Sequence, residues 1–226
     1  MSDLLKVVTI DGPSGVGKST ISRQVAAKLG FTYLDTGAMY RGVALKCQQV
    51  GVDFTDTKAL QEILDTLEMK LIPSSSNGED VQVELDGVNV SDQIRTQEIS
   101  MLASAVSALK PVRDTLTRMQ QEMGARGRIV AEGRDTGTVV FPGAAWKIYL
   151  DATPEERARR RIKQLQSRGQ EVNDQEIFEQ IVKRDRDDSE RTIAPLKAAP
   201  DAVRIDSTVI GPDEVVKKVL EVVESK

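Results

Sequence analysis

The residues best suited to chemistry lie near the amino terminus, in the segment GPSGVGKST at 12–20. Its glycines, Lys18 and Ser19 fill the pattern G-x-x-x-x-G-K-[ST], in which glycine lets the backbone curl so that successive N–H groups point inward at an anion. An apolar run at 6–10 precedes this segment, and apolar residues at helical spacing follow it at 20–30. The pattern therefore predicts a polyphosphate-binding loop between a strand and a helix N-terminus.

Within this loop, Lys18 is predicted to reach the β- and γ-phosphates, and the Ser19 hydroxyl is predicted to ligate Mg²⁺. A Gly/Ser-rich turn that matches by chance is the alternative. The strand before the loop, the helix after it and the complete pattern argue against that alternative.

Composition limits the classes of function. The 226 residues are enough for one core with at most a small inserted subdomain, and the net charge of −4 does not predict long-range attraction to nucleic acid or anionic membranes. The chain has no histidine, which excludes Ser/His triads and His/Cys zinc sites. Its single cysteine, Cys47, is expected to be buried in a helix. The apolar runs are too short for a membrane span or secretory signal, so we expect a cytoplasmic protein.

Strand-like runs alternate with helical patterns along the chain. This alternation predicts an α/β fold in which helices cover a parallel sheet. The predicted strands are 6–10, 32–34, 128–131, 146–150 and 202–206.

Residues 69–90 break this rhythm. Pro73, Asn77-Gly78 and Asp86-Gly87 separate short alternating segments there, which predicts a small antiparallel insertion.

Helix boundaries can be predicted at two further places. Pro111 should break the helical pattern of 100–121 and begin a second helix. Thr153 is expected to cap a helix over 154–169 that Gly169 closes. The segment 213–226 predicts an amphipathic helix that packs on the core.

Polar residues that follow the predicted strands are candidates for a second anion site. Tyr40 and Arg41 begin the helix after the second strand, and Arg134 and Asp135 follow the third strand. Open α/β sheets bind ligands at the carboxyl ends of their strands, so these side chains are expected to converge opposite the phosphate-binding loop.

Two charged clusters in the last third of the chain allow two interpretations. Arg184, Asp188 and Arg191 are spaced i, i+4, i+7 and would share one helix face, either at a ligand site or as a solvated salt-bridge surface. The helix before them carries a second cluster that forms either a basic lid over transferring phosphates or a charge-striped exposed helix. This second cluster consists of Arg157, Arg160 and Arg161.

The motifs GPSGVGKST, LDTGAMYR, IRTQE, EGRDTGTVVFP and RDRDDSERTIAPL together resemble the bacterial cytidylate kinases, in this order and along essentially the whole chain. The resemblance implies a nucleoside-monophosphate kinase with a three-layer P-loop fold and core strands in the spatial order 2-3-1-4-5. It implies a core at about 1–35, 110–153 and 198–226, an acceptor-binding region at about 36–109 with the insertion at 69–93, and a short helical lid at about 154–172.

The same resemblance implies the substrates and the roles of individual residues. ATP would phosphorylate CMP and dCMP with Mg²⁺, which Ser19 ligates, and the protein would act as a monomer. The catalytic residues would be Lys18, Arg41, Arg134, Arg161 and Arg191. The ATP-binding residues would be Gly12, Pro13, Ser14, Gly15, Val16, Gly17, Lys18, Ser19, Thr20, Arg157 and Arg160. The CMP-binding residues would be Thr36, Tyr40, Arg41, Ser104, Arg113, Arg134, Asp135, Arg184, Asp188 and Arg191.

Among these residues, Ser104, Arg113 and Asp135 would face the cytosine, and Arg184 and Asp188 would hold the ribose. The sequence departs from the family pattern at two positions. Thr36 stands where some members carry serine, and Glu132 stands where aspartate is frequent.

Base choice follows from hydrogen-bond polarity. Cytosine presents an exocyclic N–H group whose hydrogen bond the Asp135 carboxylate can accept, whereas uracil presents a carbonyl oxygen there, so CMP should be preferred over UMP.

Two other functions stay open on the residues alone. One is a P-loop kinase for another acceptor, such as UMP and CMP jointly or a small metabolite. The other is a nucleotide-dependent switch or nucleic-acid-remodelling ATPase.

Overall fold

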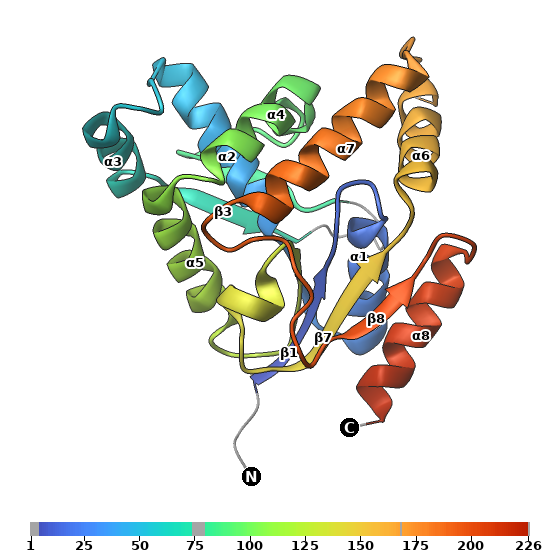
Figure 1. Ribbon diagram of the computed structural model, residues 1–226. Helices are drawn as coiled ribbons and strands as arrows, with labels where there is room; N and C mark the ends of the chain where they lie inside the picture. The colour runs from blue at the N-terminus through green and yellow to red at the C-terminus, as the bar shows by residue number, and fades with distance from the viewer. Residues whose placement is uncertain (1–4, 74–79, 168, 226) are drawn as a thin grey trace.

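The central element of the computed structural model is a five-stranded parallel sheet in the order β2-β6-β1-β7-β8 (Figure 1). The structure describes residues 5–73, 80–167 and 169–225. Numbered along the chain among themselves, the five strands have the order 2-3-1-4-5, which confirms the predicted fold. Their bounds are β1 (Leu5–Asp11), β2 (Thr32–Asp35), β6 (Ile129–Gly133), β7 (Ala144–Asp151) and β8 (Val203–Asp206).

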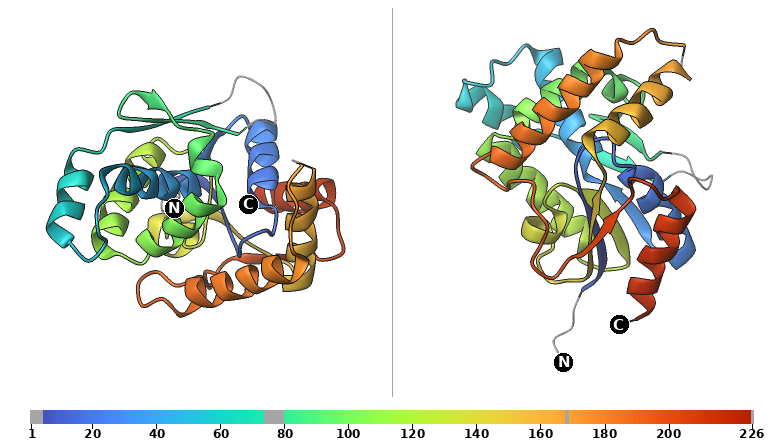
Figure 2. Two further views of the ribbon diagram at one scale, coloured as in Figure 1. Left: turned by 90° about the horizontal axis from the view of Figure 1, so that it is seen from above. Right: turned by 45° about the vertical axis from the view of Figure 1, so that its right-hand side comes forward.

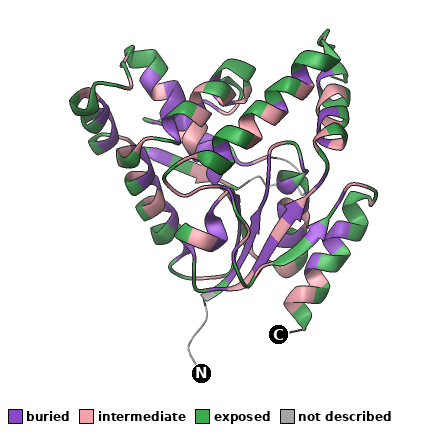
Figure 3. Ribbon diagram, viewed as in Figure 1, coloured by how far each residue is buried: buried purple, intermediate pink, exposed green. Residues whose placement is uncertain are grey.

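Helices cover both faces of this sheet. On one face, Val8 and Ile10 of β1 pack in an apolar cluster with α1 (Lys18–Leu29) and α8 (Pro212–Glu224). On the other face, Val7 belongs to a second cluster that the helices α2 (Thr36–Val50) and α5 (Lys110–Gly124) complete. Figure 3 shows the central strands mostly buried and the outer sides of the helices exposed. Each fully buried aliphatic side chain contributes about 1.5–3 kcal/mol, so these clusters fix the strand ends that carry the site.

The predicted insertion is a three-stranded antiparallel sheet in the order β3-β4-β5. Asp86 and Gly87 form the turn between β4 and β5 with positive φ values of 50° and 80°, which suit this dipeptide. The predicted turn at Asn77-Gly78 lies outside the described residues. The strands are β3 (Met69–Ile72), β4 (Gln82–Leu85) and β5 (Val88–Asn89).

The chain from the insertion back to the core is helical. Pro111 lies in the first turn of α5 and separates it from α4 (Gln97–Val106), as predicted. Cys47 is buried in α2, and burial raises the pKa of its thiol. Two short helices flank the insertion, α3 (Thr57–Asp65) before it and η1 (Gln93–Arg95) after it.

Two helices, α6 (Pro154–Gln166) and α7 (Asp174–Glu190), pack against each other as a hairpin (Figure 2). Thr153 caps α6 as predicted, since its side chain accepts from the Glu156 N–H. The helix ends at Gln166 with Ser167 as its C-cap, three residues before the predicted end at 169. Gly169, with φ of 74°, donates to the Gln166 carbonyl just beyond the helix. The second helix of the hairpin, α7, lies against α4, where Gln97 donates to Gln180 at 3.0 Å.

Over the described ranges, none of the helices combines the length and the apolarity that a bilayer span requires. The α2, α3 and α4 group and the α6–α7 hairpin both lie beyond the carboxyl ends of the sheet strands (Figure 1).

Candidate active site

The phosphate-binding loop lies between β1 and α1, as its sequence predicts. Gly12 has a φ of 156°, and a Cβ on it would lie 2.0 Å from the Leu150 carbonyl oxygen of β7, so only glycine fits. Gly17 has a φ of 99°, and a Cβ on it would meet no described atom within 4 Å. The loop is therefore closely packed where it leaves the sheet and open at the helix N-terminus.

The Lys18 side chain is buried inside this loop. Its Nζ donates to the carbonyl oxygens of Gly12 at 2.8 Å and Pro13 at 2.7 Å. Burial lowers the pKa of Lys18 well below its usual value, and the Arg134 guanidinium lowers it further. A buried ammonium with these neighbours is suited to an anionic ligand.

One carboxylate beside the loop has an unsatisfied oxygen. Glu132, at the end of β6, is buried and accepts a hydrogen bond from the Tyr33 hydroxyl on Oε1. Its Oε2 has no hydrogen-bond partner among the described residues. Burial raises the pKa of Glu132, and the nearby Asp35 carboxylate raises it further, whereas the Ser19 hydroxyl lowers it. A free carboxylate oxygen close to the Ser19 hydroxyl fits the preference of Mg²⁺ for oxygen ligands.

Two of the three arginines predicted on α6 contact the phosphate-binding loop. Arg157 is buried and donates to the Ser14 carbonyl at 3.1 Å and to Asp185 of α7 at 2.6 Å. Arg160 donates to the Val16 carbonyl at 3.1 Å. For these two side chains, the interpretation as an exposed charged helix is wrong, because α6 folds back onto the loop.

Opposite the loop, Arg134 and the residues of α7 form an ion-pair cluster. Arg134 Nε donates to Asp188 Oδ2 at 2.8 Å. Burial alone would raise the pKa of Asp188, but the Arg134 and Arg184 guanidinium groups lower it. Burial, then the charge of Arg134, lowers the pKa of Arg184 to about 10. The solvated salt-bridge interpretation is wrong for Asp188, which is 4% exposed.

Arg113 and Asp135 form a second buried ion pair, with Nη1 donating to Oδ2 at 2.9 Å. The Arg113 guanidinium lies over the Tyr40 ring, 5.5 Å from its centroid. Burial, then the Asp135 charge, raises the pKa of Tyr40 to about 12, so the phenol stays protonated. Arg191 lies 3.8 Å from Asp135 and 3.7 Å from Asp188, between the two carboxylates.

The start of α2 contributes a third group of polar side chains. Asp35 caps the helix by accepting from the Ala38 N–H at 2.8 Å, and its other oxygen lies 3.1 Å from Arg41 Nη2. The Thr36 hydroxyl donates to the Glu132 carbonyl at 2.6 Å. This contact joins α2 to the end of β6, where Arg134 follows.

Arg191 does not lie on the helix where its spacing predicts it. The i, i+4, i+7 pattern places it on the same helix face as Arg184 and Asp188, but α7 ends at Glu190 and Arg191 has a ψ of 140°. The Leu196 N–H instead bonds to the Asp188 carbonyl at 2.7 Å, which replaces a further helical turn. Arg191 therefore approaches the cluster from the segment that follows the helix.

Two further predicted residues lie at the edge of these clusters. Ser104 is half-buried on α4, and its carbonyl accepts from the Ser107 hydroxyl at 2.8 Å. Arg161 lies on α6, donates to Gln164 at 2.7 Å, and is close enough to Arg184 for its charge to lower the pKa of that guanidinium.

Sequence reasoning missed Asp11, Tyr33 and Ser107. Asp11 ends β1 and holds the loop after β6, and a carboxylate at the end of an apolar strand is a signal that could have identified it. Tyr33 donates to Glu132, and Ser107 accepts from Arg191 Nη1 at 3.4 Å. Nothing local in the sequence indicates these last two contacts.

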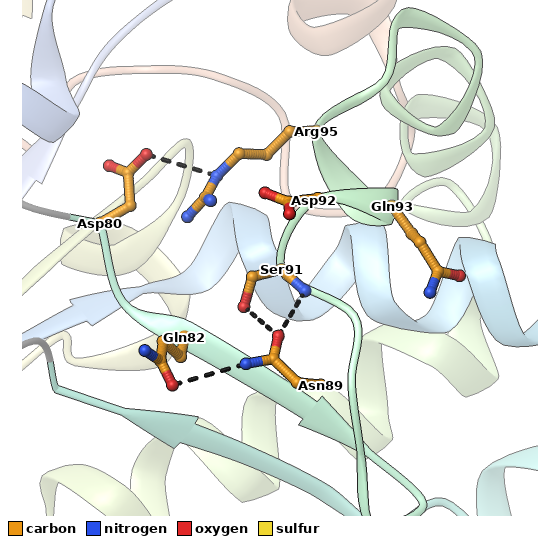
Figure 4. Close-up of a pocket in the computed structure, with 7 residues that line it drawn as sticks. All are labelled: Asp80, Gln82, Asn89, Ser91, Asp92, Gln93 and Arg95. Carbon is orange, nitrogen blue, oxygen red and sulfur yellow. Dashed lines mark hydrogen bonds and ion pairs between the residues drawn. The ribbon is translucent and has the colours of Figure 1, made fainter.

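A hollow with a volume of about 540 Å³ lies on the insertion (Figure 4). Arg95 of this hollow lies 3.3 Å from Asp80, which also pairs with Arg23 of α1, and Ser91 donates to Asn89 at 2.7 Å. None of the residues predicted for the site lines it, so we place the candidate site at the phosphate-binding loop and the arginine clusters. The lining residues are Asp80, Gln82, Asn89, Ser91, Asp92, Gln93 and Arg95.

Comparison with known proteins gives the same family that the motifs indicate. The family model described as Cytidylate kinase matches residues 8–225. The cytidylate kinase of Citrifermentans bemidjiense is 47% identical to this chain, over 97% of this chain and 91% of its own length. The cytidylate kinase of Vibrio parahaemolyticus is also 47% identical, over 100% of this chain and 99% of its own length.

The fold has relatives at much lower identity. The structure of a shikimate kinase from Bacteroides thetaiotaomicron has a TM-score of 0.50 with 14% identity, and the match covers 97% of this chain and 99% of that chain. This likeness shows the P-loop kinase fold alone. The matches over nearly the whole sequence lead to one identification: the chain belongs to the cytidylate kinase family.

Proposed function

We propose that this protein is a cytidylate kinase that transfers the γ-phosphate of ATP to CMP and dCMP, giving ADP and CDP or dCDP. One observation supports this most directly. Four arginines of the clusters described above each keep a buried guanidinium nitrogen with no hydrogen-bond partner among the described residues. Such groups favour an anion, and an acceptor phosphate supplies one. These atoms are Arg41 Nε, Arg113 Nε, Arg184 Nε and Arg191 Nη2.

On the donor side, backbone N–H groups of the loop at 12–20, other than that of Pro13, hold the ATP phosphates. Lys18 would donate to phosphate oxygens in place of the Gly12 and Pro13 carbonyls. Ser19 and Glu132 would hold the Mg²⁺ ion. The ion, when bound with ATP, neutralises part of the phosphate charge. Arg157 and Arg160 keep the loop in shape for the nucleotide, and Arg161 extends the positive surface of α6 toward Arg184.

On the acceptor side, arginines from three segments hold the CMP phosphate. Arg41, Arg134 and Arg191 surround it with Thr36 and Tyr40 beside them, while Arg184 and Asp188 bind the ribose. Two nucleotide anions repel each other, so these side chains both bind the acceptor and stabilise the charge that spreads over the transition state. The attacking phosphate oxygen is already ionised, and no general base is required.

The Arg113–Asp135 ion pair recognises the cytosine base. Asp135 accepts from the cytosine amino group, and Arg113 and Ser104 complete the pocket around the ring. Arg113 also holds the Asp135 carboxylate in place, which stops it from turning toward solvent. UMP would bring a carbonyl oxygen against this carboxylate, and the mismatch disfavours UMP.

We further propose that the protein is a cytoplasmic monomer with the regions that the resemblance implies. The core comprises about 1–35, 110–153 and 198–226, and the acceptor-binding region comprises about 36–109 with the insertion at 69–93. Residues 154–172 form the lid. Closure of the lid over the two nucleotides would exclude water from the γ-phosphate.

A coupled assay of ADP formation tests this function. The purified protein with ATP and Mg²⁺ is given CMP, dCMP, UMP, AMP and GMP in turn, and a reaction without acceptor measures hydrolysis. CMP and dCMP are expected to give the highest kcat/KM. A higher value for UMP or a purine nucleotide would contradict the acceptor, and hydrolysis that no acceptor accelerates would instead indicate a switch or remodelling ATPase.

A further inference from the structure

Asp11 occupies a position between the two nucleotide sites. It is the last residue of β1, directly before Gly12 of the phosphate-binding loop, and it is 3% exposed. Successive strand residues point to opposite faces, so Asp11 points away from the face of Ile10 and toward the chain that follows β6. In the sheet it is the register partner of Gly133.

Three hydrogen bonds fix the Asp11 carboxylate. Oδ1 accepts from the Thr136 N–H at 2.9 Å and from the Thr136 hydroxyl at 2.7 Å, and Oδ2 accepts from the Gly137 N–H at 2.7 Å. Burial raises the pKa of Asp11, and these donors offset part of that effect.

The atoms around these three hydrogen bonds are closely packed. A Cβ on Gly137 would lie 2.8 Å from the Thr9 hydroxyl and 3.3 Å from Asp11 Oδ2. The chain also turns sharply there, because Asp135 has φ of −144° and ψ of 19° and residues 136–140 form a π-helical turn. One carboxylate therefore holds the start of this turn against β1.

The turn carries the residues proposed to bind the acceptor. Arg134 and Asp135 directly precede Thr136, while Gly12 directly follows Asp11. We propose that Asp11 is a positioning residue: through Thr136 and Gly137 it fixes Asp135 and Arg134 relative to the phosphate-binding loop, and thereby sets both base selection and the alignment of the two phosphates. This inference rests on the proposed cytidylate kinase activity.

The sharpest test uses Thr136, because its side chain supplies one of the three bonds and its backbone N–H is kept when valine or serine replaces it. Thr136→Val replaces the hydroxyl by a methyl group of similar size. The kcat/KM ratio for CMP over UMP is measured together with the affinity for a fluorescent ADP at the phosphate-binding loop. We expect the ratio to fall roughly tenfold, the size of one lost charged hydrogen bond, while ADP affinity stays unchanged. Thr136→Ser keeps the hydroxyl and is expected to retain most of the ratio.

Asp11→Asn gives an independent measurement, because its amide retains one oxygen acceptor and loses the charge. A fall in the same ratio, with a cooperative melting transition, supports the inference; where Asp11→Asn does not fold, Thr136→Val decides. If the wild type prefers CMP but Thr136→Val has the same kcat/KM ratio for CMP over UMP, the inference is overturned and the proposed function is not. An equal fall in kcat/KM for CMP, in kcat/KM for UMP and in ADP affinity would also overturn the inference. A wild type that does not prefer CMP would contradict the proposed function and the inference with it.

Discussion

The two sides of the proposed site, a donor side for ATP and an acceptor side for CMP, satisfy their positive charges in different ways. On the donor side, Lys18, Arg157 and Arg160 all donate to carbonyl oxygens of the phosphate-binding loop. On the acceptor side, Arg184 and Arg191 keep buried nitrogens that have no hydrogen-bond partner among the described residues. In the proposed assignment, the cations of the donor side are therefore held by backbone carbonyls of the loop. The acceptor side consists of side chains whose remaining hydrogen bonds an anionic ligand would supply.

The largest effect is expected on the donor side, from Lys18→Ala. The variant loses the only loop side chain proposed to reach the transferring phosphate, so kcat should fall by about 10³-fold or more. Its melting transition should remain close to that of the wild type, because the lost contacts are two hydrogen bonds inside a loop. The coupled ADP assay and circular dichroism measure the two quantities.

Lys217→Ala is the matched control for that experiment. Lys217 is exposed on α8, 3.9 Å from Glu221, and lies outside both clusters. Its turnover should equal that of the wild type. Turnover of Lys18→Ala near the control value would refute the assignment of this loop.

Arg134→Lys should have the next largest effect, mainly on the acceptor side. Lysine cannot supply both the Nε bond to Asp188 and a planar group for a phosphate, so kcat/KM for CMP should fall about 100-fold. The KM for ATP should change much less, because the phosphate-binding loop is affected only indirectly, through the hairpin. Arg118→Lys, at an exposed position on α5, serves as the control. A KM for ATP that rises as much as the KM for CMP would contradict the proposal that Arg134 acts mainly on the acceptor.

Asp135→Asn sharpens the comparison within the acceptor side. An amide can donate to the uracil oxygen, so the preference for CMP over UMP should narrow by roughly ten- to a hundredfold. The measurement is the ratio of kcat/KM for the two acceptors. The loss of charge also removes the ion pair with Arg113, so the melting temperature is followed in parallel. An unchanged ratio in a folded variant would show that Asp135 does not read the base.

The smallest effect concerns Glu156, which supports the donor side through Arg160. Hydrogen bonds from Arg159, then from Arg160, lower the pKa of Glu156 to about 2, from 4.5 in an unfolded chain. A depressed carboxyl pKa stabilises the fold above the unfolded value, and this contribution is lost as the pH falls from 4.5 toward 2. Urea midpoints of Glu156→Gln should therefore depend slightly less on pH in that window than those of the wild type. Equal dependence would mean that solvent screens the pair completely.

The sequence predicts the sheet and the phosphate-binding loop because both depend on local patterns. Strand order followed from the resemblance, and the turn at Asp86-Gly87 and the helix start at Pro111 followed from backbone preferences. The position of Arg191 could not be predicted, since an i, i+7 spacing has meaning only while the helix continues. Asp11 and Thr136 are 125 residues apart, and no local pattern connects them.

The α6–α7 hairpin carries residues of both sides. Arg157 touches the phosphate-binding loop and is tied to Asp185 of α7 at 2.6 Å, and Asp188 on the same helix holds Arg134. A shift of the hairpin on binding at one of the two proposed nucleotide sites would therefore move side chains at the other. Thermodynamic linkage makes this coupling reciprocal, so each substrate should alter the dissociation constant of the other by the same factor.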